Sequence, residues 1–305
     1  MIETEGLTKR FGTLTAVENL SLQVDEGEAF GFLGPNGAGK TTTVRMLTSL
    51  ISKTSGKAWV GGLEVGLPEN ALKVRRMVGL LPENVGLYDE LSALENLEFY
   101  GRLYECPKDA RRESIERLLR MLGLWEERNL PVGSFSKGMK QKVAIARALV
   151  HEPRILFLDE PTANLDPESA KTVRDFILQL KKEHRTIFLT THNLDEAQRV
   201  CDRVGILRTK LLKIGSPAEL KAALWGTKTA VQLERADPSV VAAVRERLRP
   251  RTVELVGRTL VVDVADGEKE NPEIVEAVVR AGGRVQKVTE LSPSLEDVYL
   301  GLMRG

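Results

Sequence analysis

The sequence predicts an α/β domain built on a parallel sheet, followed by a smaller α+β domain. Residues 34–42, GPNGAGKTT, fit the phosphate-binding loop pattern G-x-x-x-x-G-K-[ST]. After Arg154, short apolar strands alternate with amphipathic helical segments, which is typical of a parallel sheet. A second, shorter series of strands and helices follows near the C-terminus. We therefore expect one domain over residues 1–220, a linker over 221–228 and an accessory domain over 229–305.

The phosphate-binding loop lies in the context that its chemistry needs. An apolar segment, 28–33, precedes it, and a segment with apolar residues at helical spacing, 42–50, follows it. The glycines let backbone N–H groups turn toward phosphate oxygens, Lys40 can reach the β- and γ-phosphates, and the Thr41 hydroxyl can ligate Mg2+. A helix that begins here also directs its positive end at the phosphates. This context argues against a plain glycine-rich turn and predicts a nucleoside triphosphate site.

The other elements of the first domain follow from periodicity. Residues 1–24 have the pattern of strands separated by glycines, and residues 83–135 turn helical, with a capping box at Ser92 and Glu95. Residues 155–158 and 186–190 have the pattern of fully buried strands, with a helix at 167–182 between them. The first domain is therefore expected to be a parallel sheet with a helical subdomain inserted over residues 83–135.

The C-terminal segment predicts a β-α-β-β-α-β order, the ferredoxin-like arrangement. A short helix over 294–303 closes the chain. The expected elements are a strand at 229–234, a helix at 238–248, strands at 252–256 and 259–264, a helix at 272–281 and a strand at 284–290.

Composition limits the classes of function. Lys plus Arg number 44 against 43 Asp plus Glu, so the formal net charge of +1 indicates no general attraction to nucleic acid. No apolar run reaches the roughly 18 to 20 residues of a membrane-spanning helix, and the first residues are acidic where a signal peptide is basic. Cys106 and Cys201 lie far apart, which indicates reduced structural thiols in the cytosol.

Two further segments carry candidate chemistry. The apolar strand at 155–158 is followed by Asp159, placed to hold Mg2+, and by Glu160, placed to polarise the water that attacks a γ-phosphate. A solvated acidic turn is the alternative. Ser136 can cap a helix, and with the small Gly138 it makes a second anion site at a helix N-terminus. Taken alone, this segment is better described as an ordinary capped helix.

In this order the motifs resemble those of the nucleotide-binding subunit of ATP-binding cassette (ABC) transporters, over residues 1 to about 220. The phosphate-binding loop is the Walker A motif, 135–139 (FSKGM) is the signature motif, and 155–159 is the Walker B motif, with Glu160 as the catalytic glutamate. The resemblance also makes 163–166 the D-loop and His192 the residue that senses the γ-phosphate. It implies ATP as the nucleotide, bound by Phe11, Asn36, Gly37, Gly39, Lys40, Thr41, Thr42, Ser136, Gly138 and Asp166. Taken alone, His192 would be a solvated loop residue, and Phe11 has a core phenylalanine of an edge strand as its alternative.

Two positions depart from the family pattern. Glu83 stands where the family has a glutamine, so a Mg2+ site of Thr41, Glu83 and Asp159 gains a negative charge. Whether Glu83 contacts the metal stays open at this point. Lys137 replaces a glycine of the signature motif, while Ser136 and Gly138 are kept.

The resemblance also implies partners and a place in the cell. Two such domains pair head to tail as a homodimer or heterodimer, so that ATP lies between them, and both act on an integral membrane permease from the cytoplasmic face of the membrane, with no nucleic acid involved. The C-terminal segment is similar to that of ATPases serving exporters of drugs, antibiotics, lipids or polysaccharides. The alternatives are an importer ATPase with a substrate-sensing tail and a soluble, non-transport ABC ATPase. For the tail itself, packing or dimerisation is favoured over ligand sensing.

Overall fold

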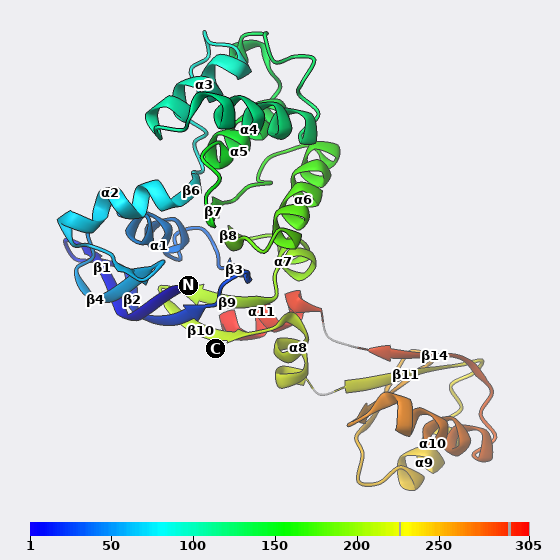
Figure 1. The fold of residues 1–305 in the computed structure, drawn as a ribbon. Helices are drawn as coiled ribbons and strands as arrows, with labels where there is room; N and C mark the ends of the chain where they lie inside the picture. Colours follow the sequence, from blue (N-terminus) through cyan, green and yellow to red (C-terminus); the bar gives the residue numbers. More distant parts are fainter. Residues whose placement is uncertain (226, 292–293, 305) are drawn as a thin grey trace. The chain divides into compact units, whose positions relative to one another are not determined.

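The computed structural model describes residues 1–225, 227–291 and 294–304, and the chain forms two compact units, Met1–Ser216 and Pro217–Gly305 (Figure 1). Each unit has its own hydrophobic core. The linker expected over 221–228 is corrected by the structure, because α8 (Pro217–Trp225) and β11 (Thr227–Leu233) occupy the described part of it. Helix α8 starts at a proline and has Glu219 in its first turn, and both features favour a helix start.

The central sheet of the first unit is predominantly parallel, as predicted. Its strand order is β10-β9-β3-β8-β7-β6, and only β10 runs antiparallel to its neighbour. Strands β3, β7 and β8 are buried along their whole length, which is typical of strands covered on both faces. Because these strands are parallel, their carboxyl ends meet at one edge. The strands are β3 (Ala29–Leu33), β6 (Val78–Leu81), β7 (Ile155–Asp159), β8 (Thr186–Thr191), β9 (Arg203–Arg208) and β10 (Lys210–Gly215).

A second, antiparallel sheet contributes to the same core as one face of the central sheet. Its order is β2-β1-β4-β5, with β1 (Ile2–Phe11), β2 (Leu14–Val24), β4 (Ser55–Val60) and β5 (Leu63–Glu64). The core between the sheets contains a cluster of phenylalanine rings from β3, β7 and β8, with neighbouring centroids 5.4–6.2 Å apart. Burying these large rings holds the parallel strands in place beneath the phosphate-binding loop.

Helices cover the remaining surfaces of the first unit. The predicted capping box is present, because Ser92 Oγ accepts from the Glu95 N–H at 3.1 Å and Glu95 Oε2 accepts from the Ser92 N–H at 2.8 Å. Helices α3, α4 and α5 contact one another and form the helical subdomain at the top of Figure 1. The helices are α1 (Lys40–Leu47), α2 (Pro68–Met77), α3 (Ala93–Leu103), α4 (Lys108–Met121), α5 (Lys137–Leu149), α6 (Pro167–Lys182), α7 (Leu194–Val200) and a 3-10 turn, η1 (Val132–Ser134).

The second unit has the predicted β-α-β-β-α-β order. Its antiparallel sheet, β12-β13-β11-β14, carries α9 and α10 on one face, where a core of mainly valine and leucine side chains lies. Helix α8 contacts the closing helix α11. The remaining elements are α9 (Pro238–Arg247), β12 (Val253–Val256), β13 (Thr259–Val264), α10 (Gly267–Arg280), β14 (Val285–Leu291) and α11 (Leu295–Arg304).

One element of this unit begins earlier than predicted. Helix α10 starts at Gly267 and contains Pro272, the residue at which the helix was expected to begin. Asp266 accepts from the Lys269 N–H at 3.3 Å, and Glu270 Oε1 accepts from the Ala265 and Asp266 N–H groups, so the helix start is satisfied before the proline. Across the described residues of both units, no helix is both long and apolar enough to cross a membrane.

Candidate functional site

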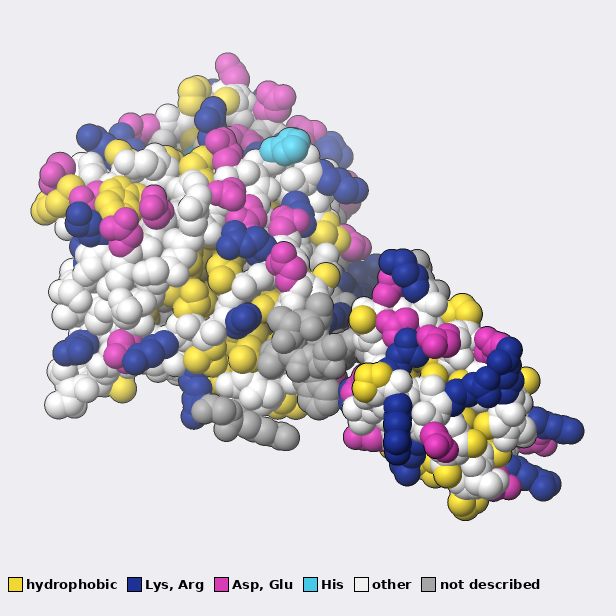
Figure 2. All heavy atoms as spheres, turned by 90° about the horizontal axis from the view of Figure 1, so that it is seen from below, with side chains coloured by type: hydrophobic (Ala, Val, Ile, Leu, Met, Phe, Trp, Pro, Cys, Tyr) yellow, Lys and Arg dark blue, Asp and Glu magenta, His cyan; other side chains and the backbone are white. Residues whose placement is uncertain are grey.

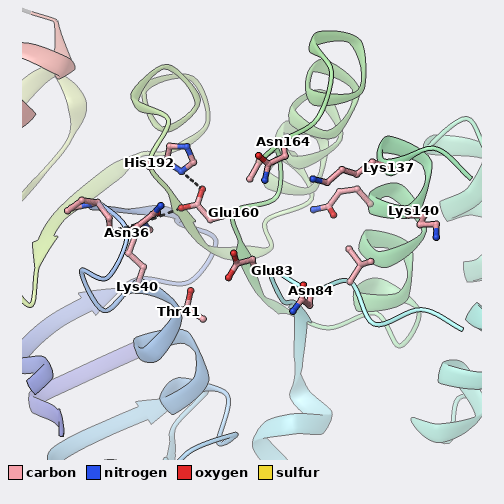
Figure 3. A pocket seen from close by; sticks show the side chains of 14 residues that line it. Asn36, Lys40, Thr41, Glu83, Asn84, Lys137, Lys140, Glu160, Asn164 and His192 are labelled. Carbon is pink, nitrogen blue, oxygen red and sulfur yellow. Dashed lines mark hydrogen bonds and ion pairs between the residues drawn. The ribbon is translucent and has the colours of Figure 1, made fainter. Parts of the chain in front are cut away.

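A pocket of about 530 Å³ opens at the carboxyl ends of β3, β7 and β8 (Figure 3). It brings together segments far apart in the sequence: the phosphate-binding loop, the loop after β6, the start of α5 and the loops that follow β7 and β8. Six of its residues are among those predicted from the sequence as site residues, namely Asn36, Lys40, Thr41, Glu83, Glu160 and His192.

The glycines of the phosphate-binding loop are required by close backbone approach. Gly39 has φ 101°, and a Cβ there would overlap the Ala16 carbonyl oxygen. A Cβ on Gly34 would lie 2.5 Å from the Leu207 carbonyl oxygen. Helix α1 then begins at Lys40, and Lys40 and Thr41 of its first turn line the pocket, where the first N–H groups of a helix have no partner within the helix. The loop and helix start together form an anion site.

Lys40 supplies a buried cation at this helix start. Its side chain is 6% exposed, and its Nζ donates to the Gly34 carbonyl at 2.6 Å and to the Pro35 carbonyl at 3.3 Å. The same Nζ forms an ion pair with Glu160 Oε1 at 3.2 Å. An ammonium group held this way can exchange carbonyl partners for phosphate oxygens, which bind it more strongly because they are charged.

Glu160 lies at the centre of the polar groups. It follows β7 directly with φ 51°, a conformation that costs a non-glycine residue about 1–2 kcal/mol. Its N–H donates to the Thr190 carbonyl at 3.0 Å, and its Oε2 lies 2.9 Å from His192 Nδ1. Figure 3 shows the carboxylate between Lys40 and His192. Backbone strain that aims a carboxylate into a pocket is typical of functional sites.

The three predicted metal ligands meet in one place. Thr41, Glu83 and Asp159 line a cavity of about 80 Å³ beside the main pocket. Asp159 is buried and accepts a hydrogen bond from Thr190 Oγ1, which orients its carboxylate. Two carboxylates and a hydroxyl are hard oxygen donors of the kind that Mg2+ prefers, and Mg2+ usually keeps water and phosphate oxygens as its other ligands. The residues therefore fit a Mg2+ ion.

Seven predicted nucleotide-binding residues are not among those that line the pocket. Three of them belong to the phosphate-binding loop and the start of α1, namely Gly37, Gly39 and Thr42, and the other four are Phe11, Ser136, Gly138 and Asp166. Ser136 is exposed and caps α5 by accepting from the Met139 N–H at 3.2 Å, and Gly138 packs against Ser169. Asp166 caps α6 through the Ser169 N–H at 2.9 Å, and this backbone hydrogen bond lowers the pKa of Asp166 below its usual value. Phe11 is 50% exposed with Lys9 Nζ 4.8 Å from its ring centroid, so its alternative as a core residue is wrong.

The pocket also contains residues that the sequence reasoning missed. Lys137, Lys140 and Gln141 line it from α5, and their spacing of three and four residues places them on one helix face. That periodicity, applied to polar residues, could have found them. From the D-loop, Asn164 lines the pocket instead of Asp166. These side chains add two cations and two amides to a site that binds anions.

The two cysteines and the surface charges bear on two other kinds of site, a reactive thiol and a nucleic-acid-binding surface. Burial raises the pKa of both the Cys106 and Cys201 thiols, and both cysteines are free, which agrees with the structural role expected for them. On the face drawn in Figure 2, Lys and Arg side chains are interspersed with Asp and Glu on both units. That face has no continuous basic stripe that could follow a nucleic-acid backbone.

The fold and motif order define a phosphate-loop ATPase of the ATP-binding cassette class. The ABC transporter family model matches residues 17–163, and the model of the ATP-binding protein DrrA1-3-like, C-terminal domain, matches residues 215–303. The linearmycin resistance ATP-binding protein LnrL of Bacillus subtilis (strain 168) is 32% identical over 310 residues, covering 99% of this chain and 98% of the relative. The daunorubicin resistance ATP-binding protein DrrA3 of Streptomyces coeruleorubidus is 35% identical over 302 residues, covering 99% and 95%. This chain belongs to the family of ABC transporter ATP-binding proteins.

Solved structures agree with this assignment. A dimeric ATP-binding cassette in a post-hydrolysis state with ADP and Pi has a TM-score of 0.65 at 26% identity, covering 71% of this chain and 98% of that one. The ATP-binding subunit of an ABC transporter has a TM-score of 0.67 at 29% identity, covering 73% and 92%. The chain is thus an ATP-binding and ATP-hydrolysing subunit of an ABC transporter, with the phosphate-loop fold predicted from its sequence.

Proposed function

We propose that this chain powers the export of a drug, antibiotic, lipid or polysaccharide through a separate membrane permease. One observation carries the proposal: relatives named for antibiotic resistance match the chain from end to end, including its C-terminal unit. The bacitracin transport ATP-binding protein BcrA of Bacillus licheniformis is 35% identical over 307 residues, covering 100% of this chain and 98% of the relative. The chain would act at the cytoplasmic face of the membrane as a peripheral subunit.

The pocket supports specific roles in ATP hydrolysis. Asn36, Gly37, Gly39, Lys40, Thr41 and Thr42 would hold the triphosphate, while Thr41, Asp159 and Glu83 would hold Mg2+, which neutralises charge on the phosphates. Lys40 pairs with Glu160 at 3.2 Å, so its transfer to phosphate oxygens would release that carboxylate. Glu160 would then accept a proton from the attacking water, and His192, 2.9 Å from Oε2, would orient it.

A second subunit would complete the site. Ser136 is exposed at the start of α5 and lies outside the pocket of its own chain, so the signature motif is available to another copy. With Gly138 it would present a helix N-terminus to the γ-phosphate across a dimer interface. The dimeric state of a similar cassette supports this arrangement, whether the partner is an identical or a related chain. Phe11 would stack on adenine, and Asp166 would lie at the interface.

The experiment is to express the full chain with the permease encoded beside it in a drug-sensitive bacterium. We expect resistance to at least one antibiotic, and its loss with Lys40→Ala, since that change removes the buried cation of the anion site. Resistance that survives Lys40→Ala would overturn the proposal. A neighbouring gene for a substrate-binding lipoprotein, with uptake in place of resistance, would favour the importer alternative.

A further inference from the structure

The buried guanidinium of Arg147 is not explained by the site described above. Arg147 lies on α5, ten residues after Lys137, which places it about 15 Å along the helix from the signature motif. It is 8% exposed. Burying a charged guanidinium is costly unless its donors are satisfied, so the partners of this side chain are informative.

Those partners belong to the loop that follows β6. Arg147 Nη1 donates to the Gly86 carbonyl at 2.8 Å and also to the Val85 carbonyl. The guanidinium lies 5.1 Å from the centroid of the Tyr100 ring on α3, and Tyr100 Oη donates to the same Gly86 carbonyl at 3.1 Å. One cation and one hydroxyl, from two helices of the helical subdomain, therefore hold one short backbone segment.

That segment is a wall of the nucleotide pocket. Glu83, Asn84 and Val85 all line the pocket. The loop follows Leu81, which is the last residue of β6 in the central sheet. At the C-terminal end of the loop, Tyr88 is held by the buried Asn96 side chain. The Tyr88 N–H donates to Asn96 Oδ1 at 2.9 Å, and Asn96 Nδ2 donates to the Tyr88 carbonyl at 3.0 Å. The loop is anchored at both ends, and Arg147 holds its middle.

We propose that Arg147 is a positioning residue of the ATPase reaction: through the Val85 and Gly86 carbonyls it keeps Glu83 at the pocket and couples movement of α5 to that loop. The proposal rests on the ATPase function proposed above. Both hydrogen bonds come from one guanidinium nitrogen, Nη1, and the planar group also lies over the Tyr100 ring, whereas a lysine ammonium is a point charge on a flexible chain and lacks this planar contact. Arg147→Lys therefore keeps the charge and weakens the double contact.

The test compares Arg147→Lys with Arg111→Lys in the full chain. Arg111 is a matched control, because it is also 8% exposed in the helical subdomain but bonds Glu98 and the Cys106 carbonyl, both at 2.9 Å, and not the loop. We expect Arg147→Lys to lower kcat by at least about tenfold while KM for ATP stays within about twofold, since Lys40 is untouched. Amide hydrogen exchange of residues 83–88 should accelerate in Arg147→Lys and stay at the wild-type rate in Arg111→Lys.

The outcomes separate this proposal from the proposed function. If the wild-type chain hydrolyses no ATP, the ATPase function fails, while the exchange of residues 83–88 still tests the Arg147 contact. An Arg147→Lys protein with normal kcat and normal loop exchange overturns the proposal, as does an equal loss in Arg111→Lys. Should Arg147→Lys fail to fold, Arg147→Gln takes its place, because its shorter side chain loses the reach to the Val85 and Gly86 carbonyls; normal kcat and normal loop exchange in that variant also overturn the proposal.

Discussion

The two ends of strand β7 carry the same residue type in the same strained backbone, and use it differently. Glu152 lies shortly before the strand with φ 53°, and Glu160 follows it with φ 51°. Glu152 accepts from Arg117 at 2.7 Å, from Ser114 at 2.9 Å and from Arg185. The Glu152 end is therefore a closed network that joins α4 to the sheet.

The Glu160 end is open by contrast. Its carboxylate shares one cation, Lys40, with carbonyl groups of the phosphate-binding loop and faces a pocket of about 530 Å³. A closed polar network stabilises a fold because each charge is paired, whereas an open one keeps partners that a ligand can replace. The difference predicts that changes at the Glu160 end act on catalysis and changes at the Glu152 end act on stability.

Among the substitutions that test this difference between the two ends of β7, Glu160→Gln is expected to have the largest effect. The amide cannot accept a proton, so the rate of ATP hydrolysis should fall by about 10²–10⁴-fold, the usual contribution of general base catalysis. ATP binding should persist, and the variant should accumulate as an ATP-bound dimer. Steady-state phosphate release and size-exclusion chromatography with ATP measure the two effects.

Two results would contradict this prediction for Glu160→Gln. Hydrolysis at the wild-type rate would remove Glu160 from catalysis and leave the open end without its assigned base. A loss of ATP binding together with hydrolysis would mean that the carboxylate mainly holds Lys40 in place, since the two groups form an ion pair at 3.2 Å.

The closed end predicts a pH effect through His151. Burial lowers the pKa of His151, and the hydrogen bond with the Val78 carbonyl at 3.2 Å raises it. Burial is the larger effect, so the pKa falls to about 4. The unfolded chain binds this proton near pH 6.5, so between these values the unfolded state holds more protons and stability falls as the pH drops. The loss from pH 7 to pH 4 should be about 3 kcal/mol.

Urea unfolding across this pH range checks the His151 prediction. His151→Phe keeps the stack on Tyr104, whose ring lies 3.8 Å away, and should remove this part of the acid sensitivity. Tyr104→Phe is the control that keeps both the stack and the histidine, so it should retain the wild-type pH dependence. Equal pH dependence in wild type and His151→Phe would contradict the assignment.

Local pattern was enough to predict the open end but not the closed one. Asp159 and Glu160 follow an apolar run, and the bounds of α6 match the predicted 167–182, because both depend on neighbouring residues. The bond from Arg117 to Glu152 joins residues 35 apart, and that from Arg147 to Gly86 joins residues 61 apart. Such pairs arise only when helices pack on the sheet, so composition and periodicity do not reveal them. The position of Glu83 was predicted from the family motif instead, and the structure brings Glu83 to the same cavity as Thr41 and Asp159.

Glu152→Gln should cost stability and spare catalysis. Losing the charge weakens its hydrogen bonds with two arginines, and because Glu152 is 44% exposed and screened by solvent, this should cost only about 1 kcal/mol of unfolding free energy. Burial raises the pKa of Glu152, but the hydrogen bonds from Arg185 and Arg117 outweigh burial and lower the pKa overall. The lowered pKa favours the ionised form of the Glu152 carboxylate. Denaturant unfolding and ATPase assays should show a lower midpoint and a kcat within about twofold of wild type. A larger loss of kcat at full stability would mean that both ends of β7 serve the reaction.

Glu83→Gln is the smallest expected effect and decides how far the open end tolerates a change of charge. Glu83 shares the cavity of about 80 Å³ with Thr41 and Asp159, and Glu160 lies at the adjoining pocket. An amide keeps an oxygen that can bind Mg2+ or water and removes one negative charge from a group of carboxylates, so the two consequences oppose each other. We therefore expect kcat within about threefold of wild type, which is less than about 1 kcal/mol of barrier. The Mg2+ concentration for half-maximal activity should rise only slightly, and Glu83→Ala, which removes the ligand oxygen, should raise it more.

A complete loss of activity in Glu83→Gln would show that the carboxylate itself is needed, and the open end would then depend on a charge that related glutamine-bearing sites lack.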